Sequence, residues 1–306
     1  MVVLTCDRVP DVNLGHGVGV ECEHRAMKVF IGSEALAAGR VTRNDLRRHF
    51  TRLAPDVYGP SDPTLTDRSI AAHLWSRRKG IVTGVAASAL HRAFWVGDDV
   101  PIELLGRSTR PPAGVIVYRD AYAPEEVTTI SGIAVATAAR TIFDLGRHLP
   151  RDEAVQRIDA LLWGTRFDVK DVLPLIERYP AARNIRRLQV ALSLADTGAE
   201  SPRETWLRLA LTDAGMAPTG TQIPVFDEAG ALVTKVDMGW EDMKVGIQYD
   251  GRHHQTDRLT YVRDQMVNRA LARLEWNVLR VIAEDPLPVT LARVEAMLSR
   301  RGGRAA

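Results

Sequence analysis

Cysteine is nearly absent from this 306-residue chain, which contains only Cys6 and Cys22. Both lie close to the N-terminal end, so no disulfide or thiolate-bound metal can hold the body of the protein together, as is typical of a reducing cytosol. No apolar run approaches the roughly 20 residues that cross a bilayer. The first residues also lack the basic, apolar and small-residue succession of a secretory signal. We therefore expect a cytoplasmic protein with no membrane partner.

Several catalytic signatures are missing as well. The chain has no glycine-rich loop of the kind that cradles phosphates, no zinc-ligand spacing and no serine-hydrolase elbow. The formal charge is only +2, from 40 Lys and Arg against 38 Asp and Glu, which neither establishes nor excludes nucleic-acid binding. Contact with DNA would therefore depend on local basic clusters such as Arg77-Arg78-Lys79.

What the chain does contain is an ordinary globular composition, 45% hydrophobic and 25% charged, with length for two or three domains of about 100–200 residues. The order of expected helices and strands predicts an α/β protein, α+β overall. We divide it into four parts: a disordered extension at 1–26, a winged-helix-like module at 27–65, a mixed α/β region at 66–198 and a nuclease-like domain at 199–306.

The winged-helix-like module is predicted from two short helices and an extended return. A helical pattern begins at Ser33 and stops at Gly39, and a second helix opens with Thr42 as its N-cap candidate. Residues 53–59 are then expected to be extended, and this order is typical of DNA-reading modules. A plain helical hairpin is the alternative interpretation. The candidate DNA contacts on the second helix are Arg47 and Arg48.

The mixed α/β region shows no catalytic constellation, and its His73 and His91 are expected to be packing or surface residues. We expect helices at 67–75 and 84–91, a strand pair at 102–105 and 115–118, and three helices between about 138 and 195. This order, with the Val-Ala-Thr-Ala-Ala-Arg-Thr-Ile-Phe-Asp-Leu run at 135–145, loosely resembles abortive-infection-type antitoxins. The resemblance implies a cognate toxin as a partner, with self-association as the alternative.

The last region begins after a boundary expected at Thr197–Glu200. Its pattern predicts a helix at 202–213, strands at 222–226, 232–239 and 244–249, a helix at 258–274, a strand at 276–282 and a helix at 288–299. The turn at Asp227–Gly230 has the residues of a hairpin. The order αβββαβ resembles the core of the PD-(D/E)xK, or restriction-endonuclease-like, fold.

Five segments carry a closer resemblance. They are Ser201-Pro202-Arg203-Glu204-Thr205-Trp206-Leu207, Lys235-Val236-Asp237-Met238, Ile247-Gln248-Tyr249-Asp250-Gly251-Arg252-His253-His254, Arg263-Asp264 and Trp276-Asn277-Val278-Leu279-Arg280. Together they resemble a bacterial family related to the very-short-patch mismatch-repair endonuclease, most of which is described as a domain of unknown function. The match covers about the last third of the chain. It implies hydrolysis of DNA with Mg²⁺, for which Mn²⁺ is a substitute.

Asp237 is the principal candidate ligand for such a cation. Phosphodiester hydrolysis needs a hard cation that polarises the phosphate and lowers the pKa of the attacking water, and Mg²⁺ prefers oxygen ligands. Asp237 closes the second expected strand, and Gln248 and Asp250 close the third. If these strands are adjacent, the three side chains converge as metal ligands. Asp237 also has no evident capping or turn role, which favours function.

The other candidate catalytic residues are Glu204, Gln248, Asp250 and His254. Glu204 has a structural role as well, because Ser201-Pro202-Arg203-Glu204 forms a capping box. Gln248 stands where relatives usually carry Glu, and its neutral amide should bind a cation less strongly. Asp250 stands where broader fold members often place Lys. The resemblance implies that His254 assists water activation, for which imidazole chemistry is suited; a solvated turn is the alternative.

Two functions follow as hypotheses. The first is a metal-dependent DNA endonuclease with an N-terminal DNA-binding module, whose phosphate contacts are Arg252, Arg263 and Arg269; a solvated helix face is the alternative for Arg263 and Arg269. The second is a catalytically idle nuclease fold that acts as an antitoxin-like DNA-binding transcriptional regulator. Gln248 and the missing Lys favour the second, and the retained Asp237, Asp250 and His254 favour the first. An interaction scaffold with no nucleic-acid role is the remaining alternative.

Overall fold

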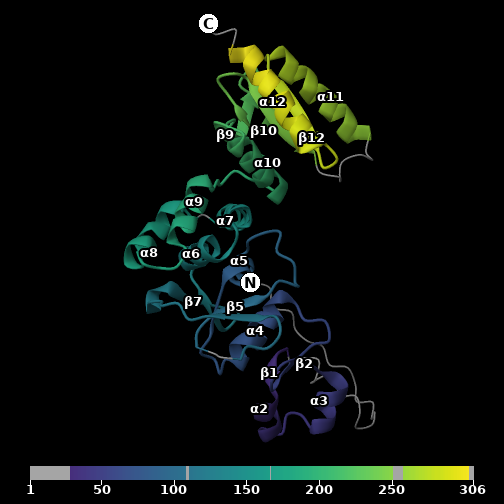
Figure 1. Cartoon of the computed structure of the whole chain (residues 1–306). Coiled ribbons are helices and arrows are strands. Elements are labelled where there is room, and N and C mark those ends of the chain that lie inside the picture. The colour runs from purple at the N-terminus through teal and green to yellow at the C-terminus, as the bar shows by residue number, and fades with distance from the viewer. Residues whose placement is uncertain (1–27, 108–109, 166, 251–257, 303–306) are drawn as a thin grey trace.

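The computed structural model describes residues 28–107, 110–165, 167–250 and 258–302 (Figure 1). The chain is a mixed α and β protein in which helices accompany three separate sheets. Figure 1 shows three units that follow one another along an elongated molecule. We call residues 28–63 the N-terminal unit, 64–198 the middle unit and 199–302 the C-terminal unit. The expected extension at 1–26 lies outside the described residues.

The N-terminal unit contains the expected two helices and β-ribbon. Its elements are β1 (Phe30–Ile31), α2 (Gly32–Ala37), α3 (Arg43–His49), β2 (Thr51–Ala54) and β3 (Val57–Gly59). The three strands pair in the order β1-β3-β2, all antiparallel. Thr42 caps α3 as predicted, because its side chain accepts from the Asp45 backbone N–H while Asp45 Oδ2 accepts from the Thr42 N–H. Gly39, with φ of +64°, follows the end of α2.

The middle unit is built around a five-stranded sheet in the order β6-β5-β4-β8-β7. Its elements are α4 (Leu65–Trp75), β4 (Ile81–Thr83), α5 (Gly84–Leu90), β5 (Ile102–Leu105), β6 (Val115–Tyr118), η1 (Pro124–Glu126), β7 (Val127–Ile130), β8 (Ile133–Ala136), α6 (Ala138–His148), α7 (Arg151–Gly164), η2 (Val169–Val172), α8 (Leu173–Arg178) and α9 (Ile185–Leu194). The expected strand pair is present, and it is parallel. His73 and His91 bond the carbonyls of Gly80 and Ala136, so both are packing residues.

The core of the middle unit holds buried ions as well as apolar side chains. Arg140 and Arg147 lie on α6 and are 0% and 2% exposed. Both guanidinium groups contact Asp144, at 3.0 Å and 3.1 Å, and Arg140 also contacts Glu126 at 2.6 Å. Burial of charges at this depth is tolerated only when they are paired. The network therefore fixes α6 against the segments around it.

The C-terminal unit has the expected αβββαβ order followed by one more helix. Its elements are α10 (Pro202–Asp213), β9 (Gly220–Phe226), β10 (Leu232–Trp240), β11 (Val245–Asp250), α11 (Arg258–Arg273), β12 (Asn277–Ile282) and α12 (Leu287–Gly302). The sheet order is β12-β11-β10-β9, and only β11 and β12 are parallel. One apolar cluster joins α10 and α12 to the sheet, and a second joins α11 to it. The sheet therefore lies between two helical layers.

A buried carboxylate connects the middle and C-terminal units. Asp159 on α7 is 1% exposed and accepts from the Thr205 hydroxyl at 2.9 Å and from Arg208 at 2.7 Å, both on α10. It also accepts from the Asp196 backbone N–H at 2.8 Å. Helix α10 thus packs on both units, although the sequence places the boundary just before it.

Among the described residues, no helix is both long enough and apolar enough to cross a membrane.

Candidate functional site

The candidate site lies where β10 and β11 separate. The two strands pair from Trp240↔Val245 to Met238↔Ile247, and Asp237 is the next residue beyond the last pair. The carboxylate Oδ2 of Asp237 accepts from the Tyr249 backbone N–H at 2.6 Å, so it satisfies a donor that the sheet no longer pairs. Asp237 thus has a structural bond across the two strands, although it has no capping or turn role. Asp237 also does not close its strand, because β10 continues to Trp240.

The fork opens into a cavity of about 720 Å³ that collects the predicted strand residues. Its acidic and amide lining residues are Glu200, Gln222, Asp237, Gln248, Asp250 and Asp264, and its basic lining residues are Lys235, Arg263 and Arg280. The three predicted ligands Asp237, Gln248 and Asp250 thus share one cavity, as the adjacency of β10 and β11 requires. Gln222 has a left-handed φ of 49° within β9, and such strain in a non-glycine residue is concentrated at functional sites.

The cavity is a poor environment for the charge on Asp237. Burial, as the largest cause, and the neighbouring carboxylates of Glu204, Glu200 and Asp250 together raise the pKa of Asp237 to about 7. The Tyr249 N–H acts in the opposite direction. A carboxylate held among other carboxylates keeps its charge at neutral pH more easily when a cation is bound. The electrostatics at the fork thus favour a positively charged ligand.

Glu204 stands behind the cavity and does not line it. Its Oε1 accepts from the Ser201 hydroxyl at 2.8 Å, and its Oε2 accepts from the Glu200 backbone N–H at 2.9 Å. The Ser201 hydroxyl accepts from the Glu204 N–H, so the predicted N-cap is present. The reciprocal bond of a capping box differs from the prediction, because the Glu204 carboxylate takes the Glu200 N–H in place of the Ser201 N–H. Burial raises the pKa of Glu204 as well. Glu200, four residues earlier, supplies the carboxylate that reaches the cavity.

Gln248 and Asp250 are already engaged by other side chains or backbone groups. The Gln248 amide nitrogen donates to the Lys235 carbonyl at 3.1 Å. This bond does not involve the amide oxygen, which is the atom that would bind a cation. Asp250 Oδ2 accepts from Arg280 at 3.3 Å, and the same guanidinium nitrogen lies 3.6 Å from Asp264. Arg280 on β12 therefore pairs with both Asp250 and Asp264.

The donors at the fork fit a hard cation in chemistry, since all are carboxylate or amide oxygens. They do not form a closed trio. Among the residues that the structure describes, only Asp120, Asp144 and His148 bring three ligand atoms within 4.8 Å of one another. A cation at Asp237 would therefore keep several water ligands, as Mg²⁺ commonly does.

The cluster of Asp120, Asp144 and His148 in the middle unit was not predicted. The Arg147 guanidinium donates to both of its carboxylates, and His148 Nε2 lies 3.3 Å from Asp120 Oδ2. Hydrogen bonds from His148 and Arg147 hold the pKa of Asp120 well below its usual range. The negative charge that a metal would need is thus already neutralised by Arg147.

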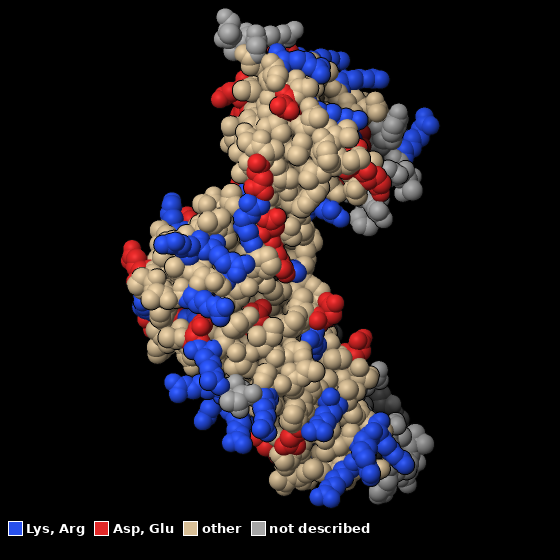
Figure 2. Space-filling view, viewed as in Figure 1, with Lys and Arg blue, Asp and Glu red and all other residues tan. Residues whose placement is uncertain are grey.

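The predicted DNA contacts are spread over the molecule. Arg47 and Arg48 are exposed on α3, Arg269 is exposed on α11, and Arg263 is exposed at the edge of the cavity. Figure 2 shows Lys and Arg side chains gathered over the N-terminal unit and the adjoining part of the middle unit. Arg252 and His254 lie outside the described residues.

Comparisons with known proteins give relatives without an assigned activity. No model of a known protein family matches the chain. The uncharacterized proteins MT2308 and Rv2248 from two strains of Mycobacterium tuberculosis are each 26% identical over 231 residues, which is 75% of this chain and 84% of theirs. The crystal structure of the RV2827C protein from the same organism is similar with a TM-score of 0.40 and 14% identity, over 67% of this chain and 82% of that one.

Proposed function

We propose that the chain is a cytoplasmic, metal-dependent DNA endonuclease whose active site is the fork of β10 and β11. The proposal depends on one observation. Asp237 lines a cavity together with Glu200, Gln248 and Asp250, and burial and neighbouring carboxylates raise its pKa. Perturbed carboxylates that share one cavity are characteristic of catalytic sites. The αβββαβ order of this unit supports the same reading.

In this proposal Asp237, Gln248 and Asp250 hold a Mg²⁺ or Mn²⁺ ion through their oxygen atoms. When bound, the ion polarises the scissile phosphate and acidifies water. The Tyr249 N–H fixes the Asp237 carboxylate, so its free oxygen has a defined direction. Arg263 at the cavity edge binds the DNA phosphate. His254, outside the described residues, is the proposed acceptor of the water proton.

The N-terminal unit is proposed to bind DNA through Arg47 and Arg48 on α3, the second of its two helices. Both side chains are exposed, and a second short helix followed by a β-ribbon is the arrangement that winged-helix modules use to contact DNA. Arg252 and Arg269 are proposed to extend the phosphate contacts of the C-terminal unit.

Supercoiled plasmid incubated with Mg²⁺ or Mn²⁺ tests the proposal. The wild type should nick or linearise the plasmid, and Asp237→Asn should abolish cleavage while it preserves the acceptor for the Tyr249 N–H. Asp242→Asn, an exposed carboxylate in the turn before β11, is the matched control and should cleave normally. Cleavage by Asp237→Asn at the wild-type rate would exclude this site.

A second function is favoured by Gln248 and Arg280. An amide in place of an acid and a guanidinium beside Asp250 both reduce the negative charge available to a cation. In this alternative the fold is catalytically idle, and the protein is an antitoxin-like DNA-binding regulator with a toxin or a second copy as partner. A DNA mobility shift without cleavage in either metal would support it.

A further inference from the structure

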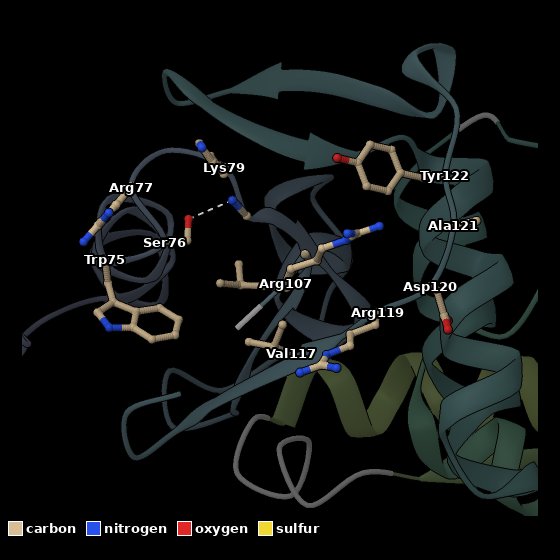
Figure 3. Close-up of a pocket in the computed structure, with 13 residues that line it drawn as sticks. Trp75, Ser76, Arg77, Lys79, Arg107, Val117, Arg119, Asp120, Ala121 and Tyr122 are labelled. Atoms are coloured by element: carbon tan, nitrogen blue, oxygen red, sulfur yellow. Dashed lines mark hydrogen bonds between the residues drawn. The ribbon is translucent and has the colours of Figure 1, made fainter. Parts of the chain in front are cut away.

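A second cavity, of about 760 Å³, lies at one end of the middle-unit sheet (Figure 3). Strand β4 is antiparallel to β5, with Ile81 opposite Leu105, and β6 is parallel to β5, with Tyr118 beside Leu105. The residues before β4 and those after β5 and β6 therefore converge at the same sheet end. The side chains that matter there are Trp75, Arg77, Lys79, Arg107, Arg119 and Tyr122.

Four of these side chains are exposed cations: Arg77, Lys79, Arg107 and Arg119. Within the described part of the chain none of them forms an ion pair or a side-chain hydrogen bond, so their charges are uncompensated. Arg78, by contrast, donates to both carboxylate oxygens of Glu34 at 2.8 Å and 2.7 Å and is committed to the N-terminal unit. Asp120, the one acid among the described residues that line the cavity, is bound by Arg147 and His148.

Aromatic and apolar groups accompany these charges. Tyr122 is 41% exposed, and in Figure 3 it lies across the cavity from Trp75. Leu104 and Val117, from β5 and β6, contribute apolar surface between them. The cavity therefore offers cations for phosphates and flat apolar surface for rings, a combination that proteins use to bind unpaired bases.

We propose that this cavity binds single-stranded nucleic acid, with phosphates on Arg77, Lys79, Arg107 and Arg119 and a base stacked on Tyr122. A duplex fits the lining less well, because its base faces are stacked inside the helix and cannot reach Tyr122. A free nucleotide also fits less well. Its single phosphate group, or single chain of phosphates, cannot contact all four cations, because they come from three separate loops. The site is distinct from the β10–β11 fork, so the inference holds whether or not the chain cleaves DNA.

Fluorescence anisotropy in EDTA tests this with labelled strands of about 12 nucleotides, as DNA, as RNA and as duplex DNA. The full chain carries Arg47→Ala/Arg48→Ala in every arm, so that the duplex contacts proposed for the N-terminal unit do not contribute. Single strands should bind more tightly than the duplex. Whichever of the DNA and RNA strands binds more tightly identifies the class of nucleic acid that the cavity recognises. Arg107→Ala/Arg119→Ala should make the slope of log K against log salt shallower by about 1.4, since each lost phosphate contact on a single strand removes about 0.7.

Two substitutions at Tyr122 separate stacking from charge. Tyr122→Ala should weaken single-strand binding roughly tenfold, whereas Tyr122→Phe should retain it, because a phenyl ring stacks equally well. Arg186→Ala/Arg187→Ala, which removes the same charge from exposed positions on α9, is the control and should bind as the wild type does. Tighter binding of the duplex, equal loss in the control, or competition by AMP as effective as that by the unlabelled strand would overturn the proposal.

Discussion

The middle and C-terminal units each contain a cluster of ionisable side chains, and the two clusters differ in how their charges are compensated. In the middle unit two guanidinium groups, those of Arg140 and Arg147, contact the buried carboxylate of Asp144. At the β10–β11 fork, burial and the carboxylates of Glu204, Glu200 and Asp250 raise the pKa of Asp237, although basic side chains line the same cavity. Removal of one partner from a compensated buried cluster is strongly destabilising, whereas a buried carboxylate crowded by other carboxylates costs stability and is characteristic of sites that bind a ligand. Substitutions in the two clusters should therefore change stability in opposite directions.

The largest effect is expected from Asp144→Ala. The Asp144 carboxylate is fully buried and also accepts from the Thr83 hydroxyl at 2.6 Å. Its removal leaves two buried guanidinium groups without their shared partner, which should lower the free energy of unfolding by about 3–5 kcal/mol. Urea denaturation followed by circular dichroism measures the loss. Asp152→Ala, at an exposed position on α7, should change stability by less than about 0.5 kcal/mol. Equal losses in the two variants would contradict the role given to the network.

A smaller loss is expected from Asp159→Ala, at the connection between the two units. The variant should lose the bonds to Thr205 and Arg208 and about 2–3 kcal/mol of stability. Because α10 then holds less firmly to α7, urea unfolding should separate into two transitions. Glu153→Ala, exposed on the same helix, is the control. A single transition at the wild-type midpoint would show that α10 is held by other contacts.

Local signals in the sequence predicted the parts of both units that depend on neighbours in the chain. Thr42 and Ser201 were predictable as helix caps because a cap bonds an N–H only three residues ahead. The hairpin at Asp227 was predictable for the same reason, since its side chain accepts from Ala229 and Ala231. The αβββαβ order follows from such local patterns and was predicted nearly to the residue.

The features that distinguish the two clusters depend on strand register, which cannot be read from the sequence. Asp237 bonds Tyr249 only because β10 and β11 separate after Met238. Glu200 resembles a linker residue, and nothing local indicates that it reaches the cavity. Arg140 and Arg147 share the carboxylate of Asp144, but the sequence shows only that all three lie on an amphipathic helix. Their burial depends on the segments that pack around α6. Strand β4, with only three residues between two helices, was missed because it is too short to show a period.

Asp237→Asn is expected to stabilise the protein at pH 8, which is the opposite of the effect at Asp144. The pKa of Asp237 is about 7 in the folded chain against an ordinary value of 3.8, so the folded state holds more protons between those values. Its stability therefore falls as pH rises through that window. The neutral amide avoids this fall, so the variant should be more stable than the wild type by about 1–2 kcal/mol at pH 8. At pH 5, nearer the lower end of that window, the difference should be about a third as large.

Urea midpoints at pH 5 and pH 8 without divalent cations measure this difference. Millimolar Mg²⁺ should then raise the midpoint of the wild type and leave that of Asp237→Asn unchanged, because only the wild type retains the carboxylate that binds the ion. If the variant were less stable than the wild type at pH 8, the Tyr249 bond would outweigh the charge at this position, and the contrast between the two clusters would not hold.

Gln248→Glu should have the smallest effect on stability and would sharpen the contrast further. It adds a fifth carboxylate to a cavity already lined by Glu200, Asp237, Asp250 and Asp264, so the metal-free protein should lose about 0.5–1 kcal/mol at pH 8. The same charge should strengthen Mg²⁺ binding about tenfold in calorimetric titration, because affinity rises with the number of charged oxygen ligands. Gln189→Glu, exposed on α9, adds the same charge elsewhere and should alter neither quantity. Unchanged Mg²⁺ affinity in Gln248→Glu would remove the fork as a cation site, and with it the reason for the crowded carboxylates around Asp237.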